Sequence, residues 1–274
     1  MANYTAADIK EIREATGAGM LDVKKALDEA DGDKAKAVEV IRVKGLKGIA
    51  KREGRTASEG LIAFDIRDSA EGRTGTLVEL NSETDFVAKN DKFVALGDEA
   101  VAAAVESGAT EPEQLAETPF GEALTNAGAS MGEKILVRRI GRVSGEAVTE
   151  YMHRTNKDLP PQVGVLVATD AAGAEVARDV AMHIAAFTPA YLSRDEVPAE
   201  LVDNERRIAQ ETAENEGKPE KAIPKIVEGR LNGFYKENVL LDQAFAKDPK
   251  KSVGQVVEEA GGTVTGFVRF RVGN

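Results

Sequence analysis

One pattern occurs twice in this chain and restricts its fold more than any other feature. An apolar run of strand length is followed by a polar connection and then by a helical segment with a single apolar stripe. The first copy spans residues 76–105 and the second spans residues 163–187. Leu77 and Leu166 lie at matching places 89 residues apart, and Phe93 and Val180 lie at matching places 87 residues apart. Repetition of one plan predicts two related α/β subdomains, and we therefore expect an α+β protein.

The first 47 residues have helical apolar spacing only. Segments 5–16, 20–30 and 34–47 each carry one apolar face, and glycine-containing turns separate them. A core of this size is marginal alone, which favours an appended interaction module. It resembles the ubiquitin-associated (UBA-like) three-helix fold, whose first loop is similar to residues 17–20, Gly-Ala-Gly-Met.

The rest of the chain divides by changes in its pattern. Residues 48–58 are predicted to be a linker, residues 59–143 core subdomain N and residues 144–274 core subdomain C. Segments 134–143 and 146–151 are expected to pair as a β-hairpin about Ser144-Gly145, and strand 263–272 should complete the second sheet.

A segment inside the second subdomain has too few apolar residues for a core. Over residues 195–236, two helical stretches share only a sparse apolar seam. This pattern favours an inserted antiparallel helical hairpin, or coiled coil, that projects from the protein. Short polar connections and a glycine-containing turn between the two stretches agree with that interpretation.

The composition leaves little chemistry to the chain. It has no cysteine, which excludes disulfides, thiol catalysis and cysteine zinc sites, and only two histidines. There is no phosphate-cradling loop and no nucleophile elbow. His183 lies in a helical apolar stripe, which favours packing over catalysis. His153 ends a strand, where a contact role and a structural role are equally weighted. We expect a protein that acts by binding, with no catalytic residue, cofactor or metal.

Charge and hydropathy restrict the partners. The net charge is −11, and residues 1–55 hold 12 basic and 10 acidic side chains, so the negative excess lies in the rest of the chain. An acidic body disfavours nucleic-acid binding. No apolar run is long enough for a membrane span and no signal core is present, so a cytoplasmic location is expected. The one basic cluster favours a solvated helix end over a contact with an acidic partner or ribosomal RNA; it consists of Arg42, Lys44, Lys47, Lys51, Arg52 and Arg55.

A bulky aromatic interrupts the polar connection at residues 81–90. This stretch reads Asn-Ser-Glu-Thr-Asp-Phe-Val-Ala-Lys-Asn, with Phe86 between charged neighbours. Loop aromatics of this kind more often pack on the core than meet a partner. Composition and spacing alone therefore leave both interpretations of Phe86 open, with packing favoured.

Several motifs together resemble the bacterial translation elongation factor Ts family. Residues 16–27 read Thr-Gly-Ala-Gly-Met-Leu-Asp-Val-Lys-Lys-Ala-Leu, and residues 81–89 form the second long motif. Shorter matches follow in the same order at 163–167, 182–186, 227–230 and 265–270. The resemblance implies a guanine-nucleotide exchange factor that binds GDP-bound and nucleotide-free elongation factor Tu. It implies no covalent catalysis, no nucleic-acid or membrane partner, and a possible homodimer through the hairpin that gives a heterotetramer with Tu.

The resemblance also implies roles for individual residues. The loop that disturbs the Mg²⁺ site of Tu matches Thr84, Asp85, Phe86 and Val87, with Phe86 as the wedge. Met20 and Lys24 match the N-terminal contact face, and Met131-Gly132 matches a loop that faces the phosphate-binding region, where Ile-Gly is common. His153 matches a contact of the second subdomain, although loop 154–161 looks longer than usual for the family.

Two other classes of function remain as alternatives. A ribosome- or RNA-associated protein would use the basic cluster at 42–55, and the acidic body argues against it. A small-molecule enzyme would need a convergent polar pocket, for which the sequence names no residues.

Overall fold

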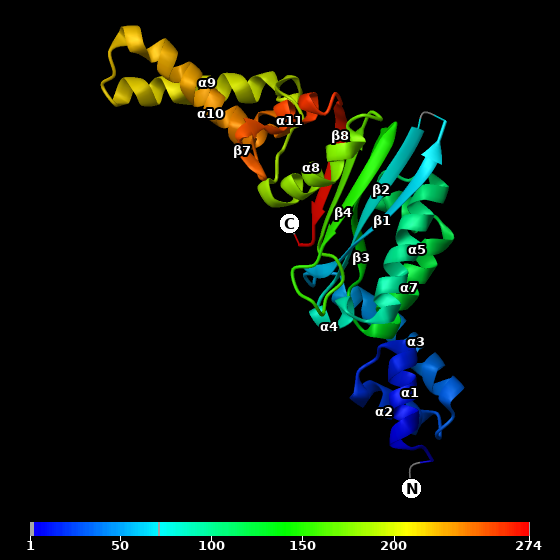
Figure 1. Ribbon diagram of the computed structural model, residues 1–274. Coiled ribbons are helices and arrows are strands. Elements are labelled where there is room, and N and C mark those ends of the chain that lie inside the picture. The colour runs from blue at the N-terminus through cyan, green and yellow to red at the C-terminus, as the bar shows by residue number, and fades with distance from the viewer. Residues whose placement is uncertain (1–2, 71, 274) are drawn as a thin grey trace.

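The N-terminal three helices form a small body of their own. The structure, a computed structural model, describes residues 3–70 and 72–273, with the side chains of residues 46–51 left aside. The helices are α1 (Ala6–Thr16), α2 (Met20–Glu29) and α3 (Lys34–Arg52), shown in blue in Figure 1. A capping box between Thr5 and Asp8 begins α1, and Gly17 ends it with a φ of 76°. Ile12, Val23 and Leu27 fill the core between them.

Helix α3 is longer than the sequence pattern predicts. It ends at Arg52 instead of Lys47, so the segment predicted as a linker begins inside a helix. Inside this helix, Gly45 serves packing against the core. A Cβ at Gly45 would lie 1.9 Å from the carbonyl oxygen of Ala129, so only glycine lets α3 approach the core this closely. The division into domains itself stays a prediction.

The first sheet has three antiparallel strands in the order β1-β2-β3. They are β1 (Glu59–Ser69), β2 (Gly72–Ser82) and β3 (Leu136–Gly145). Its helices are α4 (Asp85–Ala88), α5 (Asp91–Ser107), α6 (Pro112–Ala116) and α7 (Pro119–Met131). Apolar side chains of α5 pack on β1 and β2, with Phe93 fully buried among them. Pro112 begins helix α6, and a capping box supports its first turn.

The second sheet repeats this plan with strands β4 (Ala147–His153), β5 (Val163–Thr169) and β8 (Val264–Arg271), in the order β4-β5-β8. Helix α8 (Ala174–Phe187) follows its central strand, as α4 and α5 follow β2. The chain also forms β6 (Ala244–Phe245), β7 (Asp248–Ser252) and α11 (Val253–Glu259). As predicted, the last strand completes this sheet, and the mixed α+β class is confirmed.

The predicted hairpin of β3 and β4 is wrong. β3 pairs with β2, whereas β4 pairs with β5 in the other sheet. Only Glu146 separates the two strands, so the chain steps from one sheet to the other instead of reversing. Alternating apolar residues look the same in both arrangements, and the sequence pattern therefore could not separate them.

The two sheets pack against each other, and Figure 1 shows their strands side by side. Leu77 of β2 and Leu166 of β5 lie in one buried cluster with residues of β1, β4 and β8. A Cβ at Gly75 would lie 2.8 Å from the Leu166 Cδ1 atom, so the sheets are in close contact there. Helices cover the outer faces, which explains why β5 is buried along its whole length.

A buried ion pair links the two sheets. Glu79 of β2 is fully buried, and the Arg139 Nε donates to its Oε2 over 2.6 Å. The backbone N–H of Gly273, beyond β8, donates to the other carboxylate oxygen over 3.0 Å. Arg139 also donates to the Arg271 carbonyl oxygen over 2.8 Å and lies over the Phe270 ring. One carboxylate thereby joins β2, β3 and the end of β8.

Helices α9 (Ala199–Asn215) and α10 (Ile223–Asn238) extend away from the sheets (Figure 1). They bury a narrow seam of Ala209, Val227 and Leu231 between them, apart from the larger cores. Short 3-10 turns lie at their ends, at Arg194–Glu196, Glu220–Ala222 and Leu240–Asp242. Within the described residues, we find no helix with the length and apolar character needed to cross a membrane.

His183 is a packing residue, as its place in the α8 stripe indicates. Its side chain is almost fully buried, and its ring stacks on Phe187 with centroids 4.6 Å apart. Its Nε2 lies 2.8 Å from the Gln243 Oε1, and its Nδ1 accepts the Ala246 backbone N–H over 3.2 Å. This geometry needs the neutral ring, with its proton on Nε2. Burial lowers the pKa of His183 more than the Gln243 contact raises it.

Replacing Glu79 with alanine should destabilise the protein by about 3 kcal/mol, because Arg139 then keeps a partly buried charge without its partner. Urea unfolding of the wild type and Glu79→Ala measures the difference. Asp68→Ala is the control, since its exposed carboxylate pairs with Arg73 at the surface and should matter little. A loss for Glu79→Ala no larger than for Asp68→Ala would contradict the assigned role.

The His183 environment predicts a pH dependence of stability. Its pKa is lowered in the folded state, so the unfolded chain binds the proton more strongly. The free energy of unfolding should therefore fall as pH drops below about 6.5, the ordinary histidine pKa, towards the lower folded value. Urea unfolding measured across this range gives the free energy of unfolding as a function of pH, and its slope should be shallower for His183→Asn than for the wild type. Equal slopes for the two proteins would contradict the assigned effect of His183.

Candidate functional site

The residue 84–88 turn presents Phe86 to solvent. The Thr84 side chain caps the short helix α4 by accepting the Val87 backbone N–H over 3.4 Å. Val87 and Ala88 are buried in the first core, while Asp85 and Phe86 face outward. The Phe86 side chain is 73% exposed. Composition and spacing favoured packing, whereas the family resemblance implied an outward ring, and the structure places this ring at the surface.

Lys89 holds the exposed ring from one side. Its ammonium nitrogen lies 4.2 Å from the Phe86 ring centroid and 3.4 Å from the Asp85 Oδ2. Both contacts follow from helical spacing, three residues from Phe86 and four from Asp85. Sequence reasoning missed Lys89, although this spacing was the signal that could have found it.

Glu133 anchors the beginning of the same turn. Its carboxylate accepts the backbone N–H groups of Glu83 and Thr84, each over 3.0 Å, and the Thr84 hydroxyl over 2.5 Å. Glu133 follows the Met131-Gly132 pair directly in the chain. The structure therefore brings together two of the segments that the sequence singled out, through a residue that sequence reasoning did not name.

The Met131-Gly132 pair is only partly available to a partner. Met131 is the last residue of α7 and is buried, whereas Gly132 is exposed with a φ of 74°. The neighbouring Ser130 hydroxyl donates to the Thr16 carbonyl oxygen over 2.6 Å. Met131 thus lies at the junction with the N-terminal helices, and what this loop exposes is the Gly132 backbone.

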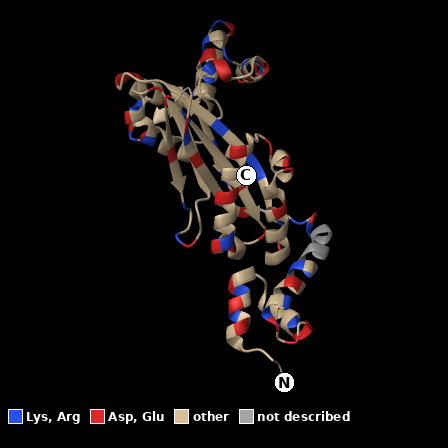
Figure 2. Ribbon diagram, turned by 90° about the vertical axis from the view of Figure 1, so that its right-hand side faces the viewer, with Lys and Arg blue, Asp and Glu red and all other residues tan. Residues whose placement is uncertain are grey.

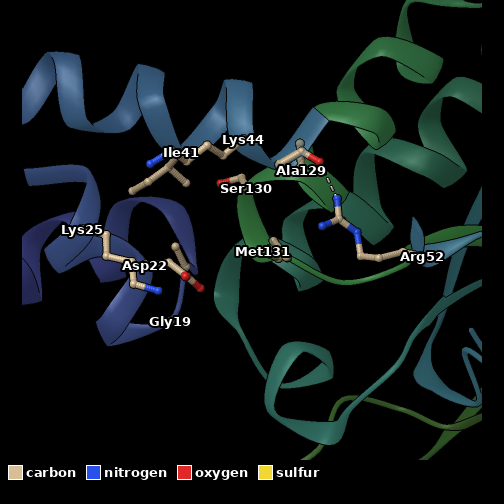
Figure 3. Close-up of a pocket in the computed structure, with 12 residues that line it drawn as sticks. Gly19, Asp22, Lys25, Ile41, Lys44, Arg52, Ala129, Ser130 and Met131 are labelled. Atoms are coloured by element: carbon tan, nitrogen blue, oxygen red, sulfur yellow. Dashed lines mark hydrogen bonds between the residues drawn. The ribbon is translucent and has the colours of Figure 1, made fainter. Parts of the chain in front are cut away.

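A pocket of about 240 Å³ lies at that junction (Figure 3). Helix α2 contributes Asp22 and Lys25, α3 contributes Lys44, and α7 contributes Ser130 and Met131. On α2, Met20 and Leu21 are 57% and 71% exposed, and Lys24 is also exposed, while Val23 points into the helical core. The predicted contact residues Met20 and Lys24 therefore lie on the surface.

His153 lies at the end of β4. It is exposed, and its Nδ1 is 3.2 Å from the Tyr151 hydroxyl. The long loop that follows is fixed to the first sheet: Leu159 is buried in the first core, and the Pro161 carbonyl oxygen accepts the Ile62 N–H over 2.8 Å. Figure 1 shows this loop beside α4. His153 therefore lies at the same end of the core as the Phe86 turn.

The sequence of this chain matches known proteins along its whole length. A family model described as elongation factor TS matches residues 83–274. Proteins named elongation factor Ts from Beutenbergia cavernae and Micrococcus luteus are 64% and 62% identical, and one from Kineococcus radiotolerans is 54% identical; each match covers 100% of both chains. The chain belongs to the elongation factor Ts family. Membership implies a nucleotide exchange factor of translation elongation with elongation factor Tu as its partner.

Most of the described side chains of the basic cluster form contacts within the protein itself. Arg42 donates to the Asn126 Oδ1 over 3.1 Å, Arg52 donates to the Gly45 carbonyl oxygen over 2.7 Å, and Lys44 pairs with Glu29. Arg55 pairs with Glu83 at 3.1 Å. The side chains of Lys47 and Lys51 lie outside the described residues. Figure 2 shows acidic and basic residues interspersed over these helices. These contacts favour a structural role for the cluster over RNA binding.

Proposed function

We propose that this protein releases GDP from elongation factor Tu by inserting Phe86 beside the Mg²⁺ site of Tu. The observation that carries the proposal is the exposed ring on an anchored turn. Phe86 is 73% exposed, while Val87 next to it is 8% exposed and Thr84 is held by Glu133. An apolar ring fixed at the surface is ready to be buried by a partner without first being ordered.

Phe86 and its neighbours have different parts in this proposal. Burial of the ring against Tu contributes about 1.5–3 kcal/mol. Thr84 caps the turn, Asp85 provides a charged side chain beside the ring, and Val87 packs the turn on the core. No bond is made or broken, since the factor favours a deformed nucleotide site. By linkage, this protein lowers the affinity of Tu for GDP by the same ratio by which GDP lowers the affinity of Tu for this protein.

The other contacts distribute binding over the N-terminal helices and both core subdomains. We assign Met20 and Lys24 of α2 to a first contact, with exposed Leu21 between them. Gly132 supplies a second contact through its backbone, since the Met131 side chain is buried. His153 supplies a third from the second subdomain. In this proposal residues 1–47 act as the UBA-like module, joined through 48–58 to subdomains 59–143 and 144–274.

The exposed apolar residue of α9 supports a second proposal, that α9 and α10 form a dimerisation hairpin over residues 195–236. Ile208 is 43% exposed on a helix that is otherwise polar on its outer side. A second copy that covers Ile208 would bury it, and a dimer carrying two Tu molecules would be a heterotetramer.

Phe86→Ala should slow the stimulated release of a fluorescent GDP analogue from elongation factor Tu by about 10- to 100-fold, which corresponds to the lost burial of the ring. Phe64→Ala is the matched control, because Phe64 is 38% exposed on β1, outside the site. A wild type without effect on release would overturn the proposed function. Equal activity of wild type and Phe86→Ala would overturn only the role of the ring.

Ile208→Glu should convert a dimer to a monomer, because it places a charge at the centre of the proposed interface. Sedimentation equilibrium measures the mass of each protein. Gln210→Glu adds a similar charge on the opposite side of α9 and should leave the mass unchanged. If wild type is already a monomer at every concentration tested, the dimerisation proposal is wrong.

A further inference from the structure

We propose that Glu83 and Glu133 form a reciprocal clamp that makes the Phe86 turn and the residue 131–134 loop move as one unit. In this proposal Glu133 is a positioning residue for nucleotide exchange. The clamp itself is a property of the free protein, and its part in exchange rests on the function proposed above. The clamp adds Glu83 and Glu133 to the residues that support exchange, although neither needs to touch the partner.

The first half of the clamp runs from Glu133 to the turn. Its Oε2 accepts two consecutive backbone N–H groups, those of Glu83 and Thr84, each over 3.0 Å. Its Oε1 accepts the Thr84 hydroxyl over 2.5 Å. That hydroxyl oxygen in turn accepts the Val87 N–H. One carboxylate therefore fixes the backbone that begins α4 and, through Thr84, the residue that follows Phe86.

The second half of the clamp runs in the opposite direction. The Glu83 Oε1 accepts the Lys134 backbone N–H over 2.6 Å. Each of the two glutamates therefore caps the backbone beside the other. Arg55 donates to both Glu83 oxygens, over 3.3 and 3.1 Å, and supplies positive charge beside that carboxylate. The Glu83 side chain is only 16% exposed, so water screens these contacts weakly.

The sheet cannot replace these contacts. The last paired residue of β2 is Ser82, opposite Glu59, so the N–H groups of Glu83 and Thr84 lie beyond the ladder. The Leu136 pairing likewise begins after Lys134. Hydrogen bonds to a carboxylate are shorter and stronger than those between neutral groups. The clamp therefore sets where Phe86 and Gly132 lie relative to each other.

Removal of the Glu133 carboxylate tests this role. Glu133→Ala should lower the GDP release rate from Tu, measured at saturating factor, by about tenfold or more, the worth of a charge-assisted hydrogen bond. The factor concentration for half-maximal effect should change much less, since other contacts carry binding. Glu133→Gln should recover most of the rate, because its amide oxygen still accepts the backbone N–H groups and its NH₂ can donate to the Thr84 oxygen.

A second measurement uses the free protein. Amide hydrogen exchange should become faster at Glu83 and Thr84 in Glu133→Ala, and also at Lys134, whose N–H bonds to Glu83 and not to Glu133. Acceleration at Lys134 is the signature of a reciprocal clamp. Glu146→Ala is the matched control, since the Glu146 carboxylate caps the Ala171 N–H over 2.9 Å at another junction. It should leave GDP release and these three amides unchanged.

The outcomes separate the clamp from the proposed function. If wild type does not accelerate GDP release, the proposed function fails, and the role of Glu133 in exchange fails with it, while amide exchange still decides whether the clamp exists. If wild type is active and Glu133→Ala keeps its maximal rate, or Lys134 exchange is unchanged, the clamp proposal is wrong. The clamp proposal is also wrong if the loss of GDP release rate in Glu133→Ala equals the fraction of that variant that is unfolded and Glu133→Gln does not recover the rate.

Discussion

The buried ion pair of Glu79 and Arg139 is the constraint on which the rest of the core depends. A carboxylate with no solvent exposure is tolerated only when its oxygens are occupied, and here Arg139 and the Gly273 N–H occupy them. These partners come from β3 and from the residues after β8. The two sheets must therefore be assembled in one relative position before Glu79 is satisfied, and the apolar contacts of Leu77 and Leu166 then fill the space between them.

The core fixes the position of the loops at one end of the two sheets. β2 is buried along almost its whole length, and the chain leaves it at Ser82 to form the turn that carries Phe86. The loop after His153 packs on the same end through Leu159. Functional loops gain accuracy from such support, because a rigid scaffold limits where their side chains can lie. Exposed Phe86 and Gly132 thus lie on loops that a buried strand and its core support.

The sequence predicted local structure well and long-range contacts poorly. Helical stripes and strand patterns identified the N-terminal helices, β2, α5, β5 and α8, because each pattern depends on neighbours within a few turns. The sequence could not show that β3 and β4 belong to different sheets, since the alternation of apolar residues is the same in a hairpin and in two separate sheets. Glu133 went unnoticed because its partners lie 49 and 50 residues away. The family resemblance named Phe86 but gave no reason to expect a buried Met131.

The hydrogen bond between Glu79 and Gly273 also has a consequence for synthesis of the protein. Its two residues are 194 positions apart. While the ribosome is still making the second half of the chain, the first sheet has an uncovered apolar face and a carboxylate without its last donor. Nascent chains in this condition aggregate readily, because they expose surface that the finished protein buries. The second sheet and the last residues of the chain must therefore be made before this face and this carboxylate are complete.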